Sequence, residues 1–65
     1  MSLKSRFLKT YADLPISERS NVMAVIDGNP LSWNVAKIEI EVGTKIGLRV
    51  LEFLDKNDLL KKDDR

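Results

Sequence analysis

The clearest pattern in the sequence follows Thr44, and it predicts an amphipathic helix that runs to about Asn57. Apolar residues recur there at three- and four-residue spacings, which places them along one stripe of a helix. The Thr44 hydroxyl can cap the first turn by accepting a hydrogen bond from a free amide, and Asn57-Asp58 provides a stop. The stripe consists of Ile46, Val50, Leu51, Phe53 and Leu54. We expect the rest of the chain to pack around it.

The length of 65 residues leaves room for one small domain, residues 1–65, with a charged tail over residues 61–65 that we expect to fray. With no cysteine and no histidine, the chain can form neither a disulfide nor an ordinary zinc site, and we expect no cofactor. Self-association is then the remaining way to add stability to a domain with a small core. No apolar run approaches the roughly 20 residues that span a bilayer, and no apolar leader is present, so we expect a cytoplasmic protein.

Two further helices are predicted from caps and periodicity. Ser2 can cap the first, which runs to Ala12 and ends before Pro15. Ser32 can cap another, ahead of Trp33. The first helix has an apolar face made of Leu3, Phe7, Leu8 and Tyr11, and the inner face of the other is made of Trp33, Ala36 and Ile40. The residues of the second helix from Ile38 to Val42 also alternate apolar and charged, as a half-buried strand does.

The segment between these helices admits two interpretations. Ser17 can cap a helix with Val22, Met23 and Ile26 on its apolar face, ended by the turn residues 27–30. The rival is a strand, because the run is rich in β-branched residues and Asp27-Gly28 is a strong hairpin signal. We predict an all-α domain of three to four helices in a helix-turn-helix-like arrangement. The alternative is an α+β fold with a β-hairpin over residues 21–42.

Catalysis is not expected of this chain. The acids, bases and nucleophiles present are carboxylates, lysines, hydroxyls and one tyrosine, and no nucleophile, phosphate-loop or metal-hydrolase motif occurs. Glu39 and Glu41 look like a carboxylate pair, but residues two apart on a helix point away from each other. We therefore predict a protein that is not an enzyme and binds no metal.

The stretch from Leu31 to Leu60 contains a short capped helix, a break at Gly43, a longer capped helix and an apolar end. This order resembles the reading half of helix-turn-helix and winged-helix DNA-binding domains, with residues 51–60 similar to the end of a recognition helix entering a wing. Too few residues follow Leu60 to build the wing hairpin itself. The resemblance implies a dimeric protein that binds double-stranded DNA.

The cations on the helix after Thr44 give this idea a physical basis. Lys45, Arg49 and Lys56 fall along one stripe opposite much of the apolar face, although Glu52 and Asp55 lie close to it. The net charge of +1 supplies no global attraction for a polyanion, so local segregation of charge has to provide it. The candidate nucleic-acid-binding residues are Thr44, Lys45, Arg49, Lys37 and Asn34.

The alternative function is a small interaction or self-associating module. Leu48 motivates it, because this residue falls outside the main apolar stripe of its helix. Tyr11 and Trp33 are the other candidate partner-binding residues, and the partner is a second copy or another protein. A surface of mixed charge around Lys45 and Arg49 would favour this alternative.

Overall fold

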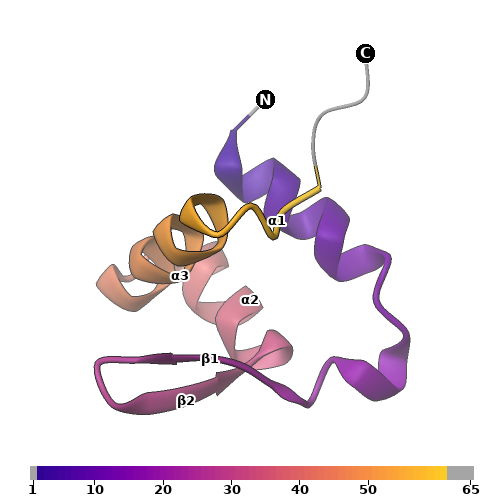
Figure 1. Ribbon diagram of the computed structural model, residues 1–65, viewed down its shortest axis with the longest axis horizontal. Helices are drawn as coiled ribbons and strands as arrows, with labels where there is room; N and C mark the ends of the chain where they lie inside the picture. Colours follow the sequence, from indigo (N-terminus) through magenta and orange to yellow (C-terminus); the bar gives the residue numbers. More distant parts are fainter. Residues whose placement is uncertain (1, 62–65) are drawn as a thin grey trace.

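The computed structural model describes residues 2–61, which form helices and one two-stranded antiparallel sheet (Figure 1). In chain order the elements are α1 (Leu3–Ala12), the 3₁₀ helix η1 (Ile16–Glu18), β1 (Val22–Ile26), β2 (Asn29–Ser32), α2 (Trp33–Val42) and α3 (Lys45–Lys56). The fold is therefore α+β, and the predicted all-α class is wrong. The α+β alternative is confirmed, with a hairpin shorter than residues 21–42 because α2 is helical throughout.

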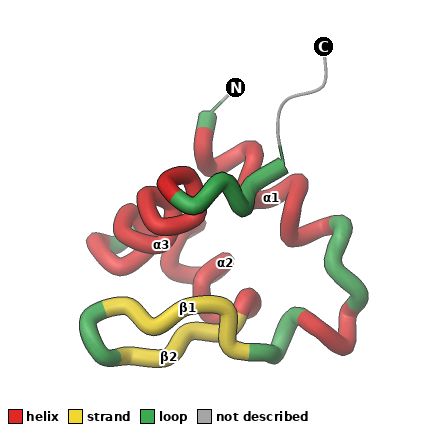
Figure 2. Tube along the Cα trace, viewed as in Figure 1, coloured by secondary structure: helices red, strands yellow, loops and turns green. Residues whose placement is uncertain are grey.

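The predicted helix after Ser17 is replaced by η1 and by a hairpin of β1 and β2 (Figure 2). Asp27 and Gly28 have φ angles of +52° and +81°. Positive φ at both central residues is what a two-residue type I′ turn requires, and its twist matches that of the flanking strands. The register pairs Ile26 with Asn29, Val25 with Pro30, Ala24 with Leu31 and, beyond an irregularity, Val22 with Ser32. Turn geometry and the β-branched run thus outweigh the capping signal of Ser17.

The three other predicted caps are confirmed. Ser2, Ser32 and Thr44 each accept, on the side-chain hydroxyl, a hydrogen bond from the amide three residues further on, at 3.0–3.1 Å. Each cap satisfies one of the amides that a helix start leaves without a partner. Gly43 ends α2 in the left-handed conformation, with φ of +86°, and its amide donates to the Glu39 carbonyl. These local signals fix where α1, α2 and α3 begin.

The core lies where the three helices meet the inner face of the hairpin. Helix α2 is central, because it contacts α3, β2 and α1 (Figure 1). Phe7, Val50 and Leu54 are the largest fully buried side chains. The remaining buried apolar residues are Ala24, Ile26, Leu31, Ala36, Ile40, Leu51 and Leu60. Each element except η1 therefore contributes to one core.

Gly47 sets the distance between α2 and α3. A Cβ atom at this position would lie 2.5 Å from the carbonyl oxygen of Glu39 and 2.9 Å from the Cα atom of Ile40. Both are backbone atoms, so they cannot move aside as a flexible side chain could. A side chain larger than hydrogen is therefore excluded at this helix crossing.

The segment after α3 folds back toward α1. The Leu59 amide donates to the Leu54 carbonyl at 2.9 Å, and Leu60 enters the core while Leu59 stays half exposed. Leu60 thus covers the end of the core. Of the tail expected to fray, only Lys61 belongs to the part that the structure describes.

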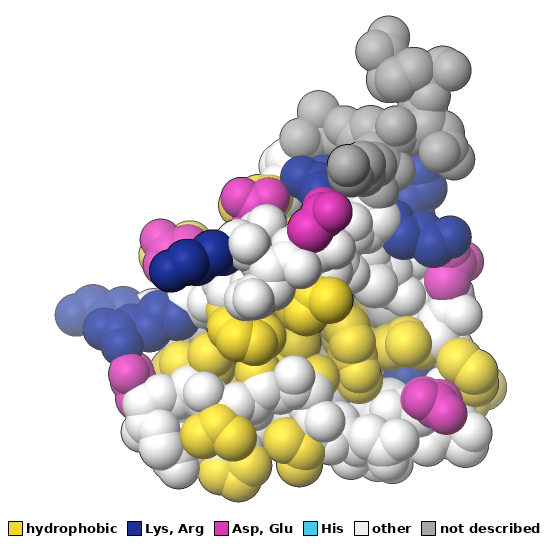
Figure 3. Space-filling model, in the orientation of Figure 1, with side chains coloured by type: hydrophobic (Ala, Val, Ile, Leu, Met, Phe, Trp, Pro, Cys, Tyr) yellow, Lys and Arg dark blue, Asp and Glu magenta, His cyan; other side chains and the backbone are white. Residues whose placement is uncertain are grey.

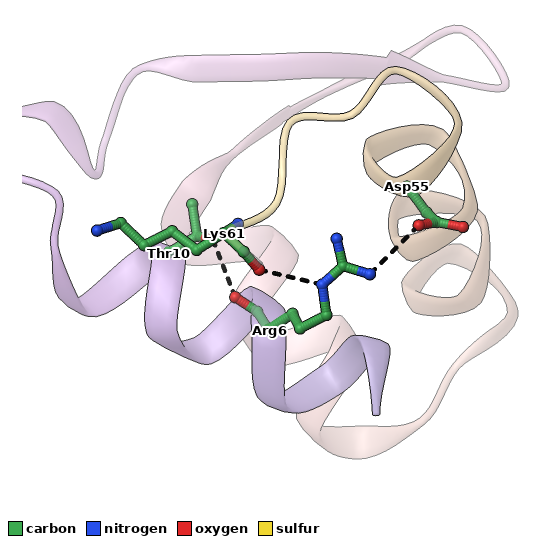
Figure 4. A network of polar contacts seen from close by, with 4 residues as sticks. All are labelled: Arg6, Thr10, Asp55 and Lys61. Atoms are coloured by element: carbon green, nitrogen blue, oxygen red, sulfur yellow. Dashed lines mark hydrogen bonds and ion pairs between the residues drawn. The ribbon is translucent and has the colours of Figure 1, made fainter. Parts of the chain in front are cut away.

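Polar contacts clamp this returning segment to α1 (Figure 4). The Lys61 amide donates to Thr10 Oγ1 at 2.8 Å, and Arg6 Nε donates to the Lys61 carbonyl at 3.0 Å. Arg6 also lies 3.5 Å from a carboxylate oxygen of Asp55. Lys61 Nζ is 2.5 Å from the Asp13 carboxylate, and this hydrogen bond, with the charge of Lys61, holds the pKa of Asp13 below its ordinary value. The end of α3 is thereby fixed to α1 on the molecular surface.

Candidate interaction surface

The Thr44 hydroxyl is engaged within the fold. It accepts from the Gly47 amide at 3.0 Å and donates to Glu39 Oε1 at 2.5 Å. Both hydrogen bonds are internal, one capping α3 and one joining it to α2. A ligand that took this hydroxyl would have to replace the Glu39 carboxylate.

Arg49, the central cation of the predicted basic stripe, is neutralised by a neighbour on the hairpin. One terminal nitrogen of its guanidinium lies 2.5 and 2.7 Å from the two carboxylate oxygens of Asp27. The pair ties α3 to the β1–β2 turn. Lys45 is exposed and makes no ion pair with any of residues 2–61. Of the two cations on which DNA binding was predicted to depend, Arg49 is therefore paired with a carboxylate, whereas Lys45 is exposed to solvent.

The outer face of α3 carries charges of both signs. Glu52 lies three residues after Arg49 and four before Lys56, so helical geometry puts it beside both cations. Figure 3 shows basic and acidic side chains next to one another over α3 and the end of the hairpin, with apolar side chains gathered between these elements. A surface of this kind lacks the continuous positive strip that attracts a phosphate backbone.

Asn34 and Lys37 lie together, but with Tyr11 rather than with Lys45 and Arg49. The Tyr11 hydroxyl donates to Asn34 Oδ1 at 2.5 Å. Lys37 Nζ lies 5.6 Å from the centre of the Tyr11 ring, and the Arg19 guanidinium lies 4.5 Å from it. These contacts connect α1, the segment after η1 and the start of α2. The structure thus divides the predicted nucleic-acid-binding residues between two separate places.

The three predicted partner-binding residues are also separated. Trp33 and Tyr11 are partly buried and both stack on the fully buried Phe7, with ring centres 6.0 and 6.2 Å from it. Leu48 lies on the outer side of α3 and is 58% exposed. The two aromatic residues therefore close the core, while Leu48 stands apart from them on the surface.

A second apolar face of α2 is the feature that sequence reasoning missed. Val35, Ile38 and Val42 are 41%, 58% and 72% exposed. At about 100° per residue, the three positions fall on one side of the helix, turned away from Ala36 and Ile40 in the core. We name these three residues the α2 outer face. It is an uninterrupted aliphatic stripe, because Glu39 and Glu41 lie on either side of it.

This face carries a signal that the sequence already contained. The spacings of three and four residues from Val35 through Ile38 to Val42 are those of an amphipathic helix stripe. The inner face formed by Trp33, Ala36 and Ile40 has the same spacings, so α2 carries two apolar stripes. The alternation of Ile38 to Val42 arises because successive residues belong in turn to the two faces and to the charged flanks, and it does not mark a strand.

Residues 2–61 contain no group of three or more acidic side chains placed to hold a metal ion, and their surface has no pocket. None of the helices described has the length and apolar character needed to cross a bilayer. No protein-family model matches the sequence, and no curated protein or solved structure shows significant similarity to it.

Proposed function

We propose that this chain is a small, non-enzymatic protein–protein interaction module that docks through the α2 outer face. The observation that carries the proposal is the exposure of three branched aliphatic side chains in one stripe of a helix whose opposite face is already buried. A helix that is apolar on both sides is normally covered on both sides. Contiguous exposed apolar stripes on a small domain mark surfaces that bind a partner.

The mixed charge of α3 supports this proposal over nucleic-acid binding. Arg49 is paired with Asp27, the Thr44 hydroxyl with Glu39, and Lys37 with Glu41. Binding a phosphate backbone would require some of these contacts to be exchanged for contacts to DNA. The helix-turn-helix resemblance and its DNA partner remain a prediction, which the experiment below tests as the competing outcome.

The experiment compares wild type with two surface variants, Ile38→Glu and Leu48→Glu. Both residues are 58% exposed, so neither change disturbs the core, but only Ile38 belongs to the α2 outer face. Each tagged protein is used to capture partners from cells that express it, and the captured proteins, including untagged copies of the chain, are quantified by mass spectrometry. We expect at least one partner to be lost with Ile38→Glu and kept with Leu48→Glu.

Two results would overturn the proposal. One is the same set of captured proteins for wild type and Ile38→Glu. The other is salt-dependent binding of labelled duplex DNA, measured by fluorescence anisotropy, that is weakened by Lys45→Ala and Arg49→Ala but not by Ile38→Glu. That outcome would restore the basic stripe of α3 as the functional surface.

A further inference from the structure

We propose that the bond between Asp27 and Gly28 is a modification site, at which aspartate rearranges spontaneously to isoaspartate, and that the ion pair with Arg49 slows this reaction. The site lies at the tip of the β1–β2 hairpin and does not involve the α2 outer face. Three features define it: the residue that follows the aspartate, the exposure and conformation of the turn, and the contacts of the Asp27 carboxylate.

The reaction needs only the two residues of the turn and water. The Gly28 backbone nitrogen attacks Cγ of Asp27 and forms a bond to it, while one carboxylate oxygen leaves as water with the amide proton and a proton from solvent. The product is a five-membered succinimide ring. Water then opens the ring: attack at Cγ restores aspartate, whereas attack at the backbone carbonyl carbon breaks its bond to the Gly28 nitrogen and gives isoaspartate. No oxidant is needed, and the final mass equals the starting mass.

The attacking nitrogen is open in this fold. Gly28 has no side chain, and a Cβ atom placed there would have no neighbouring atom within 4 Å. The Gly28 amide donates no hydrogen bond within residues 2–61. Both turn residues are exposed, with φ angles of +52° and +81°. Water therefore reaches the turn, and no side chain obstructs closure of the ring.

Asp58 provides a matched comparison within the same chain. It is exposed and its φ of +56° is close to that of Asp27, but Leu59 follows it. The leucine side chain crowds the backbone nitrogen, and the Leu59 amide already donates to the Leu54 carbonyl at 2.9 Å. The two aspartates thus share a backbone conformation and differ in the nitrogen that has to attack. We expect Asp27 to react and Asp58 to stay unmodified.

Arg49 holds the other reacting group. One terminal nitrogen of its guanidinium lies 2.5 and 2.7 Å from the two carboxylate oxygens of Asp27. One of these oxygens has to leave when Cγ is attacked, so ring closure gives up at least one of the two contacts. Both side chains are more than half exposed, so salt weakens their attraction. We therefore expect Arg49 to slow the reaction about 2- to 5-fold, the factor that an exposed ion pair contributes.

Isoaspartate does not fit the hairpin that contains it. The type I′ turn joins the paired positions Ile26 and Asn29 through two residues, and isoaspartate adds one atom to the backbone of this short loop. The hairpin places Ala24, Ile26 and Leu31 in the core, so a loss of register disturbs buried side chains. We expect the isomerised protein to unfold at a lower urea concentration than the unmodified protein.

Ageing of the folded full chain tests the site. Wild type, Arg49→Ala and Lys45→Ala are incubated at neutral pH below their unfolding transitions, then digested with a protease that cleaves before aspartate but not before isoaspartate. We expect isoaspartate to accumulate at position 27, at unchanged mass, and not at position 58. Arg49→Ala should isomerise about 2- to 5-fold faster than wild type. Lys45→Ala removes the same charge from the same helix and should keep the wild-type rate.

Two controls separate the ion pair from general unfolding. Ser2→Ala removes the cap of α1, which lowers stability and leaves the pair between Arg49 and Asp27 in place. It should isomerise at the wild-type rate. Molar salt screens exposed ion pairs, so it should accelerate the reaction in wild type and not in Arg49→Ala.

The outcomes are distinguishable. The site is overturned if position 27 of the folded chain stays unmodified for as long as the urea-unfolded chain takes to form isoaspartate there, or if Asp27 and Asp58 react equally. Control by Arg49 is overturned if Arg49→Ala reacts no faster than Lys45→Ala, or if Ser2→Ala reacts as fast as Arg49→Ala. None of these results depends on the α2 outer face, so the proposed function stands or fails separately.

Discussion

Helices α2 and α3 are neighbours that begin in the same way, yet their outer faces have opposite character. Ser32 caps α2 and Thr44 caps α3 with similar geometry, and each helix buries one face in the core. The outer face of α3 carries charges of both signs beside the exposed side chains of Leu48 and Phe53, whereas the outer face of α2 is an aliphatic stripe. Charge drew the sequence-based prediction of function to α3. The comparison teaches that charge can be read from the sequence, whereas the apolar surface that folding leaves uncovered can be read only from the folded protein.

The difference has a simple energetic meaning. Exposed charges on α3 remain hydrated and are partly paired within the molecule, so they need no further partner. The exposed aliphatic side chains of α2 order water, and covering them is favourable by about 25 cal/mol for each Å² removed from water. Covering the α2 outer face would therefore release binding free energy. The following predictions test the contrast between the two helices, from the largest expected effect to the smallest.

The largest effect is expected where the two helices cross. Gly47→Ala places a Cβ atom against the backbone of Glu39 and Ile40, so α2 and α3 must separate. We expect the free energy of unfolding to fall by about 3 kcal/mol, measured by urea denaturation. Leu48→Ala, the next position on α3, serves as the control and should cost less than ~0.5 kcal/mol. Equal effects of the two changes would mean that the crossing is looser than the structure indicates.

The two faces of α2 should differ sharply in their importance for monomer stability. Ile40 is 5% exposed and Ile38 is 58% exposed, although they are the same residue type two positions apart. Ile40→Ala should cost about 2–5 kcal/mol by leaving a cavity, and Ile38→Ala less than ~0.5 kcal/mol. Denaturation is measured at low micromolar concentration, where self-association contributes least. If the two variants lost similar amounts of stability, Ile38 would belong to the monomer core, and the α2 outer face would not be an exposed surface.

The caps of the two helices provide the next test. Ser32→Ala removes one capping hydrogen bond and should cost about 1 kcal/mol. Thr44→Ala removes a cap and also the hydrogen bond to Glu39, so we expect a larger loss, up to about 2 kcal/mol. Thr44→Ser keeps both hydrogen bonds and is the matched control. If Thr44→Ala lost no more stability than Ser32→Ala, the hydrogen bond to Glu39 would add no net stability.

A smaller effect is expected from the ion pair between α3 and the hairpin. Arg49 and Asp27 are both more than half exposed, so water and salt screen their attraction. A double-mutant cycle with Arg49→Ala and Asp27→Ala should give a coupling of about 0.5 kcal/mol that declines in molar salt. Lys45→Ala, which removes an exposed cation from the same helix, should show no coupling to Asp27. Coupling that persists in high salt would mark the pair as a stronger structural contact.

The smallest effect concerns the clamp that holds the segment after α3. Lys61 lowers the pKa of Asp13 in the folded protein, so the ionised carboxylate favours folding. This contribution is present above the ordinary aspartate pKa of about 3.9, and it is lost as pH falls through the lower pKa of the folded state. Asp13→Asn should therefore be less stable than wild type at pH 7, and the difference should shrink as pH falls through the lowered pKa of the folded state. A stability difference that does not change with pH would contradict this pair.

Some features followed from local chemistry and were predicted correctly. The caps at Ser2, Ser32 and Thr44 each need only a hydroxyl and the next turn, and all three formed as expected. The buried stripe of α3 was largely right, since Val50, Leu51 and Leu54 are in the core, although Phe53 is exposed. Residues 22–26 were wrongly predicted as a helix. They form a strand because pairing with β2 stabilises it, and this pairing outweighs the helix cap that Ser17 could supply.

The sequence alone determined the starts of the helices, the periodicity of their apolar residues and the absence of thiol and imidazole chemistry. Tertiary structure decided that Ala36 and Ile40 are covered while Ile38 and Val42 are not, and that Arg49 meets Asp27 across 22 positions of sequence. The reason is that periodicity is a property of one segment. Which of two apolar faces is covered, and which charge finds a partner, depends on segments distant in the chain that only folding brings together.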